Sequence, residues 1–85
     1  MEVHIGKVTH YWDHIHVAGV VLNGKLKVGD KVHIKGHTTD LEEIVGSIHI
    51  EHVQVQEANV GDSVGITVAE PVREHDEVFV IVLEE

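Results

Sequence analysis

Two closely spaced turns within residues 23–36 constrain the fold of this chain more than any other feature of its sequence. The first, Asn23–Gly24, is a dipeptide that favours a tight reversal because both positions tolerate positive φ. The second is Gly29–Asp30. Polar and apolar residues alternate after each turn, so that Val32 and Ile34 would face one side of a sheet. We therefore predict two reversals of one continuous hairpin region.

Alternation of the same kind marks short strands along the whole chain. No stretch of about ten residues repeats apolar side chains at helical spacing. Six or seven short strands without a helix predict an all-β fold. Closure into a small Greek-key-type barrel would remove the exposed edges of these β-branched strands. The strands are predicted over about residues 3–10, 14–22, 25–28, 31–35, 44–55, 64–69 and 78–83.

One apolar face of these strands supplies the predicted core. Ile44, Gly46, Ile48 and Ile50 fall on the same face of their strand, because successive side chains of a strand point to opposite sides. The following six side chains should point into one shared core: Val32, Ile34, Ile48, Ile50, Val64 and Ile66.

Length and composition predict a single domain over residues 1–85. A chain this short buries only about 60 to 65% of its unfolded surface, which allows one compact core. It contains no cysteine, so neither disulfides nor thiolate zinc sites can stabilise it. No apolar run reaches the roughly 20 residues that a membrane span needs, and the first residues lack the features of a signal peptide. We expect a soluble cytoplasmic protein without a membrane partner.

The charge is unevenly distributed along the chain. Residues 1–39 carry five lysines against three acidic residues, a balance of +2, whereas residues 40–85 carry twelve acidic residues against one arginine, a balance of −11. An acidic surface repels phosphates, which argues against DNA and against sequence-independent binding of long nucleic acids. Four lysines could form a local basic patch or, alternatively, the solvated face of a hairpin: Lys25, Lys27, Lys31 and Lys35.

Tyr11 and Trp12 are two of the three aromatic residues of the types Phe, Trp and Tyr, and they lie together in a predicted loop. As stacking platforms they would take an unpaired base, a contact worth roughly 1 to 3 kcal/mol per base. The alternative is that Trp12 closes one open end of the barrel, since a small protein seldom leaves its only indole in water.

Nine histidines are unusual in a chain of this length. His14 and His16 would share one face of a strand, and His49 on an adjacent strand could complete a three-nitrogen metal site. No cysteine or His-Glu-X-X-His context supports a specific metal, so we expect neither a metal nor another cofactor. Asp13 beside His14 has no nucleophile attached to it, and we expect no enzymatic activity.

The order and spacing of several motifs resemble the second domain of translational GTPases such as elongation factor Tu. A closer similarity is to the carboxy-terminal domain of collagenase-like peptidases, some of which are implicated in RNA modification. The resemblance covers almost the whole chain and implies an elongation factor domain 2-type barrel that serves as an accessory module. The motifs that carry it are Val17–Val21, Asn23–Val32, Gly61–Ile66, Val8–Tyr11, Lys35–Asp40, Ile50–His52 and Pro71–Glu74.

The resemblance also implies a site, because the domain of elongation factor Tu receives the terminal adenosine of aminoacyl-tRNA. The matching loop is about His10 to His14, and the matching strand positions are His16, His49 and Thr67. This chain has His49 where the family has an acidic residue and Thr67 where it has a large apolar one.

Together these observations predict a non-enzymatic binding module associated with translation or RNA modification. It would recognise a short RNA feature, such as the end of a tRNA or an exposed base of rRNA. The alternative is a protein-interaction module that presents its acidic half to a partner enzyme or a ribosomal protein. The predicted RNA-binding residues are Tyr11, Trp12, His14, His16, Lys25, Lys27 and His49.

Overall fold

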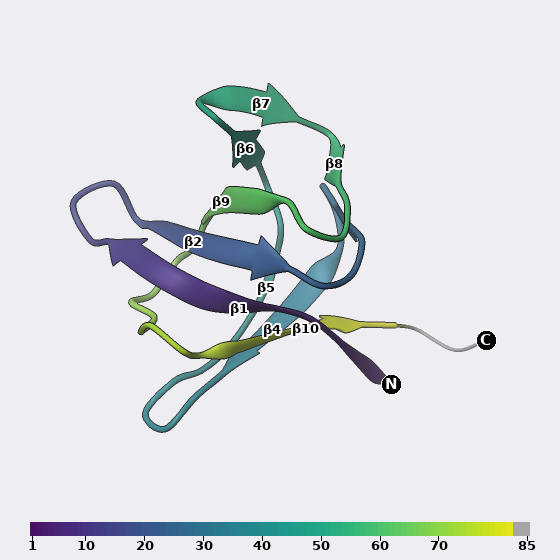
Figure 1. Ribbon diagram of the computed structural model, residues 1–85. Coiled ribbons are helices and arrows are strands. Elements are labelled where there is room, and N and C mark those ends of the chain that lie inside the picture. Colours follow the sequence, from purple (N-terminus) through teal and green to yellow (C-terminus); the bar gives the residue numbers. More distant parts are fainter. Residues whose placement is uncertain (83–85) are drawn as a thin grey trace.

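A computed structural model describes residues 1–82 of the chain as ten short β-strands connected by turns (Figure 1). No helix forms within these residues, which agrees with the predicted all-β class. The described residues therefore contain no helix that is long and apolar enough to cross a membrane. The strands are β1 (Glu2–Trp12), β2 (Val17–Leu22), β3 (Leu26–Lys27), β4 (Lys31–Lys35), β5 (Asp40–Ile44), β6 (Ile48–Ile50), β7 (Val53–Val55), β8 (Glu57–Ala58), β9 (Ser63–Thr67) and β10 (Glu77–Ile81).

Eight of the strands form one strongly curved antiparallel sheet in the order β5-β4-β10-β1-β2-β9-β6-β7. The short strands β3 and β8 pair with each other in a separate sheet. In residues 1–82 the two ends of the large sheet, β5 and β7, do not pair with each other, so the hydrogen bonds do not close it into the expected barrel of six to seven strands. The strand number is higher because a turn divides the predicted segment 44–55 into β6 and β7, and because β5 and β8 form in stretches that were predicted as connections. The predicted last strand was expected to reach Leu83, which lies outside the described residues.

The predicted core is largely confirmed. Five of the six expected side chains are at most 3% exposed, and Ile50 is half-buried and packs against the same core. Ile44 is the exception to the predicted face, since it is 64% exposed while the neighbouring Val45 is buried. The backbone of Val45 explains this, because its N–H donates to Asp30 O and its C=O accepts from Gly29 N–H, both at 2.9 Å. These two bonds turn its side chain inward where β5 ends.

The first strand is longer than the alternation predicted. β1 continues through Tyr11 and Trp12, which pair with Ala18 and Val17 of β2, and the connecting turn is residues 13–16. The prediction that Tyr11 and Trp12 lie in a loop is therefore wrong, because cross-strand pairing with β2 extends the strand to its last aromatic residue. The register of β1 against β10 shifts between His4 and Gly6, an irregularity that a glycine within a strand often marks.

Gly29 adopts the positive φ that its turn requires, at +97°. In this turn Asp30 N–H donates to Lys27 O at 3.1 Å, and the carboxylate of Asp30 accepts from Lys27 N–H at 2.9 Å. The turn from Asn59 to Asp62 repeats this arrangement around Gly61, with φ +91°. Aspartate closes these turns because its carboxylate satisfies a backbone N–H that would otherwise lack a partner.

The Asn23–Gly24 dipeptide does not form the predicted tight hairpin. Neither residue has positive φ, and β3 pairs with β8 rather than with β2 or β4. Asn23 N–H instead donates to Ile5 O at 2.8 Å, and a Cβ on Gly24 would lie 2.9 Å from Ile5 Cγ2. The glycine is thus needed for a close approach between two segments, and the two turns do not belong to one continuous hairpin.

Candidate functional site

A row of small residues crosses the outer face of the sheet. Gly19 on β2 lies opposite Gly65 on β9, and Gly65 lies opposite His49 on β6. Ser63 occupies the same face of β9, two residues from Gly65. Since neither glycine has a side chain, the sheet is hollowed between β1 and β6. We call this hollow the glycine groove.

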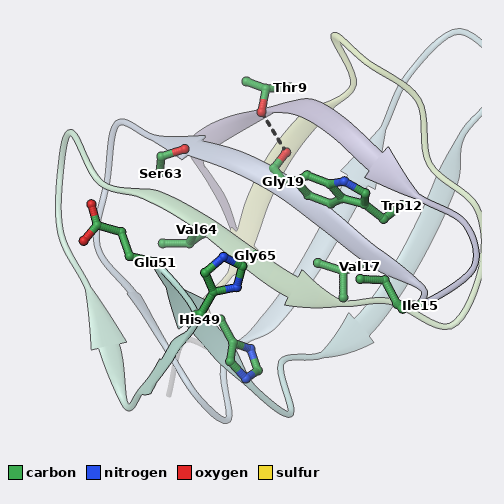
Figure 2. Close-up of a pocket in the computed structure, with 11 residues that line it drawn as sticks. Thr9, Trp12, Ile15, Val17, Gly19, His49, Glu51, Ser63, Val64 and Gly65 are labelled. Carbon is green, nitrogen blue, oxygen red and sulfur yellow. Dashed lines mark hydrogen bonds between the residues drawn. The ribbon is translucent and has the colours of Figure 1, made fainter.

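The indole of Trp12 forms one wall of the glycine groove and lies against Gly19 (Figure 2). The ring of His10 meets it edge to face, with 4.5 Å between the ring centroids. Trp12 remains 39% exposed. It belongs to the outer face of the sheet, so the alternative in which it closes an end of a barrel is wrong.

The opposite side of the groove is built by the hairpin of β6 and β7. His49 projects from β6, and the turn consists of Glu51 and His52, whose φ angles are +49° and +67°. This is a turn with two left-handed residues although it contains neither asparagine nor glycine. The groove has a volume of about 600 Å3, within the usual range for small-molecule sites, and its lining residues are Thr9, Trp12, Ile15, Val17, Gly19, His49, Glu51, His52, Ser63, Val64 and Gly65.

Charge distinguishes this groove from a phosphate site. Among its described lining residues, Glu51 is the one group with a fixed charge, and neither lysine nor arginine contributes. The walls are mostly aromatic and aliphatic, with the hydroxyl groups of Thr9 and Ser63 and the imidazole of His49 as polar atoms. The groove therefore suits a planar apolar group that carries a few hydrogen-bonding atoms at its edge.

The structure brings together only two of the seven predicted site residues, Trp12 and His49. Tyr11 lies on the opposite face of β1 and packs against the core, with its hydroxyl 3.5 Å from Nδ1 of His16. His14 and His16 belong to the exposed turn between β1 and β2 and do not share a strand face as predicted. Within residues 1–82, no cluster of three His, Cys, Asp or Glu side chains is placed to hold a metal ion.

The predicted basic residues also lie outside the groove. Lys25 follows β2, with its ammonium 3.5 Å from Glu57, and Lys27 belongs to β3. The other lysines pair with carboxylates too: Lys7 with Glu77 at 3.7 Å, Lys31 with Glu42 at 3.4 Å, and Lys35 with Glu2 at 3.8 Å. Lys25 and Lys31 are therefore solvated and paired with carboxylates, and they do not form a shared phosphate patch, although the single hairpin expected to carry them is not formed.

A family profile for elongation factor Tu domain 2 matches residues 16–80 of the chain. This chain belongs to the elongation factor Tu domain 2 family. The glycine groove thus lies on a domain of this family and uses strands β2, β6 and β9, which all fall within the matched residues.

One relative of this elongation factor Tu domain 2 chain is an uncharacterized protease of Methanocaldococcus jannaschii, with 37% identity over 81 residues. The match includes 94% of this chain but only 20% of the relative, so the chain spans about a fifth of that protein's length.

Two solved structures share the fold. Both are carboxy-terminal domains of a Geobacillus thermoleovorans protein classed with the U32 peptidases. One has a TM-score of 0.85 at 19% identity and covers 89% of this chain and 96% of its own. The other has a TM-score of 0.86 at 18% identity, and the match covers 92% of this chain and 91% of that structure. The fold of this domain 2 chain is therefore also that of a carboxy-terminal domain in a larger protein.

Sequence reasoning missed most of the groove. Gly19 and Gly65 build its floor, yet small residues in separate strands show no sign of being neighbours until the strands are paired. Glu51 and His52 gave no turn signal, because neither is one of the residue types that usually mark turns, which are glycine, proline, asparagine, aspartate and serine. A glycine at the centre of each of two alternating strands was the one available signal, since such glycines mark a close approach of another group.

Proposed function

We propose that this domain is a cytoplasmic, non-catalytic accessory module in translation or RNA modification, and that its glycine groove receives one unpaired base of an RNA, such as a base at a tRNA end. The observation that carries the proposal is the indole of Trp12 lying over Gly19 at one side of the glycine floor, with His49 at the other side. Bases of every kind stack on such aromatic platforms, because every base has a π-face.

The shape and polarity of the groove support a base as the ligand. A base is flat and largely apolar on its faces, and its hydrogen-bonding atoms lie at its edge. The groove offers an indole and aliphatic walls for the faces, and hydroxyl and imidazole groups for the edge. Because the indole of Trp12 covers Gly19, the base would reach the sheet surface beside it, over Gly65.

The comparisons support an accessory role rather than a complete enzyme. The chain matches a fifth of a protease-named relative, and its structural relatives are carboxy-terminal domains. In the proposal, catalysis belongs to a larger partner, and this module presents the RNA to it.

Ionic contacts should add little to the affinity. Lys25 is paired with Glu57, and the net charge of the chain is −9. Binding should therefore depend on stacking, and its salt dependence should be shallow compared with that of proteins that contact many phosphates.

Trp12 allows a direct test, because it is the only tryptophan of the chain. Titration with a short single-stranded RNA ending in an unpaired adenosine should quench its fluorescence. The Trp12→Ala variant, assayed by calorimetry, should bind about 1 to 3 kcal/mol more weakly, while His14→Ala, in the exposed turn outside the groove, should bind normally. If the fluorescence were not quenched and both variants bound the RNA with equal affinity, the groove would not be the site that binds the base.

A second candidate function rests on the lysine pairs. Carboxylates lie within 4.0 Å of Lys7, Lys25, Lys31 and Lys35, so the surface offers few free cations against its acidic excess. The module would then present this acidic surface to a basic partner, such as a ribosomal protein or an enzyme. Salt-sensitive association with isolated ribosomal proteins that persists in Trp12→Ala would support this function over RNA binding.

A further inference from the structure

His33 is clamped between two carboxylates from two other strands. On the outer face of β4, its Nδ1 lies 2.5 Å from Glu2 Oε2, and its Nε2 lies 2.5 Å from Asp40 Oδ1. Glu2 begins β1 and Asp40 begins β5. Only 11% of the His33 side chain is exposed, compared with 82% of the Asp40 side chain. The ring is therefore enclosed and connects three strands through two contacts.

The two contacts require the charged form of the ring. A neutral imidazole has one N–H donor and one acceptor, whereas the imidazolium donates from both nitrogens. Ionised carboxylates only accept. Consequently, loss of one proton from His33 leaves a nitrogen lone pair facing a carboxylate oxygen at one of the two contacts.

The groups around His33 decide which contact fails. From β4 itself, Lys35 directs its ammonium to Glu2 Oε1 at 3.8 Å and to the ring of Phe79 on β10 at 5.3 Å. Glu2 therefore keeps a cationic neighbour when the ring is neutral. Asp40 has no second cationic partner within 4.0 Å among residues 1–82.

The remaining charged groups on this face are already paired. Glu42 on β5 is opposite His33 in register and lies 3.4 Å from Lys31 of β4. His4 on β1 contacts Glu77 on β10 at 2.5 Å. Neither pair involves the ring of His33, so the charge balance at the clamp is set by Glu2, Asp40, Lys35 and the amino-terminal ammonium of Met1. Hydrogen bonding to His33 lowers the pKa of Glu2, and the charges of Lys35 and this ammonium lower it further.

We propose that His33 is a proton-operated latch for edge strand β5: the imidazolium holds the beginning of β5 through Asp40, and the neutral ring stays on Glu2 and releases Asp40. The release is local because β5 pairs with β4 alone and forms one end of the sheet. An unpaired sheet edge is also where an extended partner segment can add a strand.

The direction of the pH response follows from the same contacts. Hydrogen bonding to Glu2, and then to Asp40, raises the pKa of His33, and burial opposes this rise. A histidine whose pKa is raised in the folded state stabilises its contacts fully at pH values below the unfolded pKa, and this contribution disappears as pH rises through the folded value. The latch is therefore closed in mildly acidic solution and opens with rising pH.

The test compares the titration of the ring with the protection of β5 amides. Ring resonances of His33 and amide exchange of residues 40–44, corrected for intrinsic rates, are followed by NMR as pH rises. The protection factors of these residues should fall by about tenfold or more, which is the usual effect of losing a hydrogen bond to a charged group. The fall should coincide with deprotonation of His33, while the amides of β2 and β9 keep their protection.

Two variants make the test specific. Asp40→Asn should remove the step, because an amide can accept from the imidazolium and can donate to the neutral ring. His4→Gln removes another surface histidine–carboxylate pair and should leave the step unchanged. Titration of His33 without any change at residues 40–44 would overturn the proposal, and so would an equal loss of protection in every strand or a step that persists in Asp40→Asn.

Discussion

The indole of Trp12 rests directly on Gly19, and a Cβ at position 19 would lie 3.0 Å from its Cζ3 and 3.2 Å from its Cη2. This contact shapes the glycine groove, because the indole covers Gly19 and leaves its partner on β9, Gly65, as the part of the floor that the ring does not cover. The glycine is required by the neighbouring ring and not by its own backbone, since Gly19 does not have positive φ.

Gly19→Ala should therefore displace Trp12. The ring is partly exposed and can move outward, so the cost in stability should stay near the lower end of the roughly 1 to 3 kcal/mol typical of overpacking. The fluorescence maximum of Trp12 should shift, and binding of the RNA probe should weaken. Gly46→Ala is the matched control, because nothing lies within 4 Å of a Cβ at that position. Unchanged emission and affinity in Gly19→Ala would contradict the contact.

Gly29→Ala should destabilise the fold through the backbone alone. A Cβ there would meet no atom within 4 Å, but the φ of +97° is unfavourable for alanine. The expected loss is more than about 1 kcal/mol in the free energy of unfolding, measured by urea denaturation. Gly46→Ala again serves as control, since that site is equally open and lacks positive φ. An equal free energy of unfolding for the two variants would show that a side chain at position 29 does not strain the backbone.

Ile34→Ala should remove a large part of the stability of this small domain. Ile34 is completely buried in the core, and such truncations cost about 2 to 5 kcal/mol because a cavity remains. Ile44→Ala is a control with the same chemical change on the same two-strand unit of β4 and β5. Ile44 is 64% exposed, so its truncation should change the free energy of unfolding by at most about 0.5 kcal/mol. A similar loss in both variants would contradict the described register.

Glu43→Gln should make the fold more stable at neutral pH. Burial raises the pKa of Glu43, while the hydrogen bond from Ala69 N–H at 3.1 Å lowers it and the charge of Glu70 raises it further. Because the folded-state pKa is raised, the stability that the protonated carboxyl provides is complete below the unfolded pKa and is lost as pH rises through the folded value.

Glutamine can still accept from Ala69 N–H but cannot ionise. Thermal melts should therefore show a difference in melting temperature that grows in favour of Glu43→Gln between about pH 4 and pH 7. Glu42→Gln, which removes an exposed carboxylate paired with Lys31, provides the comparison and should not reproduce this growth. If the difference in melting temperature between Glu43→Gln and the unmodified protein stayed constant across this pH range, burial would not raise the pKa of Glu43.

Local sequence signals were sufficient wherever the physical cause is local. Val32 and Ile34 alternate with polar residues and are both buried as expected, because the pleat of a strand places every second side chain on one face. Gly29 and Gly61 mark turns that need positive φ, which glycine adopts at little cost. The all-β class followed from the same alternation. The family resemblance of the sequence agrees with the match to elongation factor Tu domain 2.

Tertiary structure alone decided how these strands are combined. Alternation defines two faces of a strand but does not specify its partner, so it could not predict that β3 pairs with β8. Nor could it predict that Asn23–Gly24 packs against Ile5 instead of forming a hairpin. The same holds for the candidate site. Trp12 and His49 were predicted for it, but the floor between them exists only because β2 and β9 bring Gly19 opposite Gly65. Strand register depends on contacts between residues distant in sequence, and these contacts form only in the folded chain.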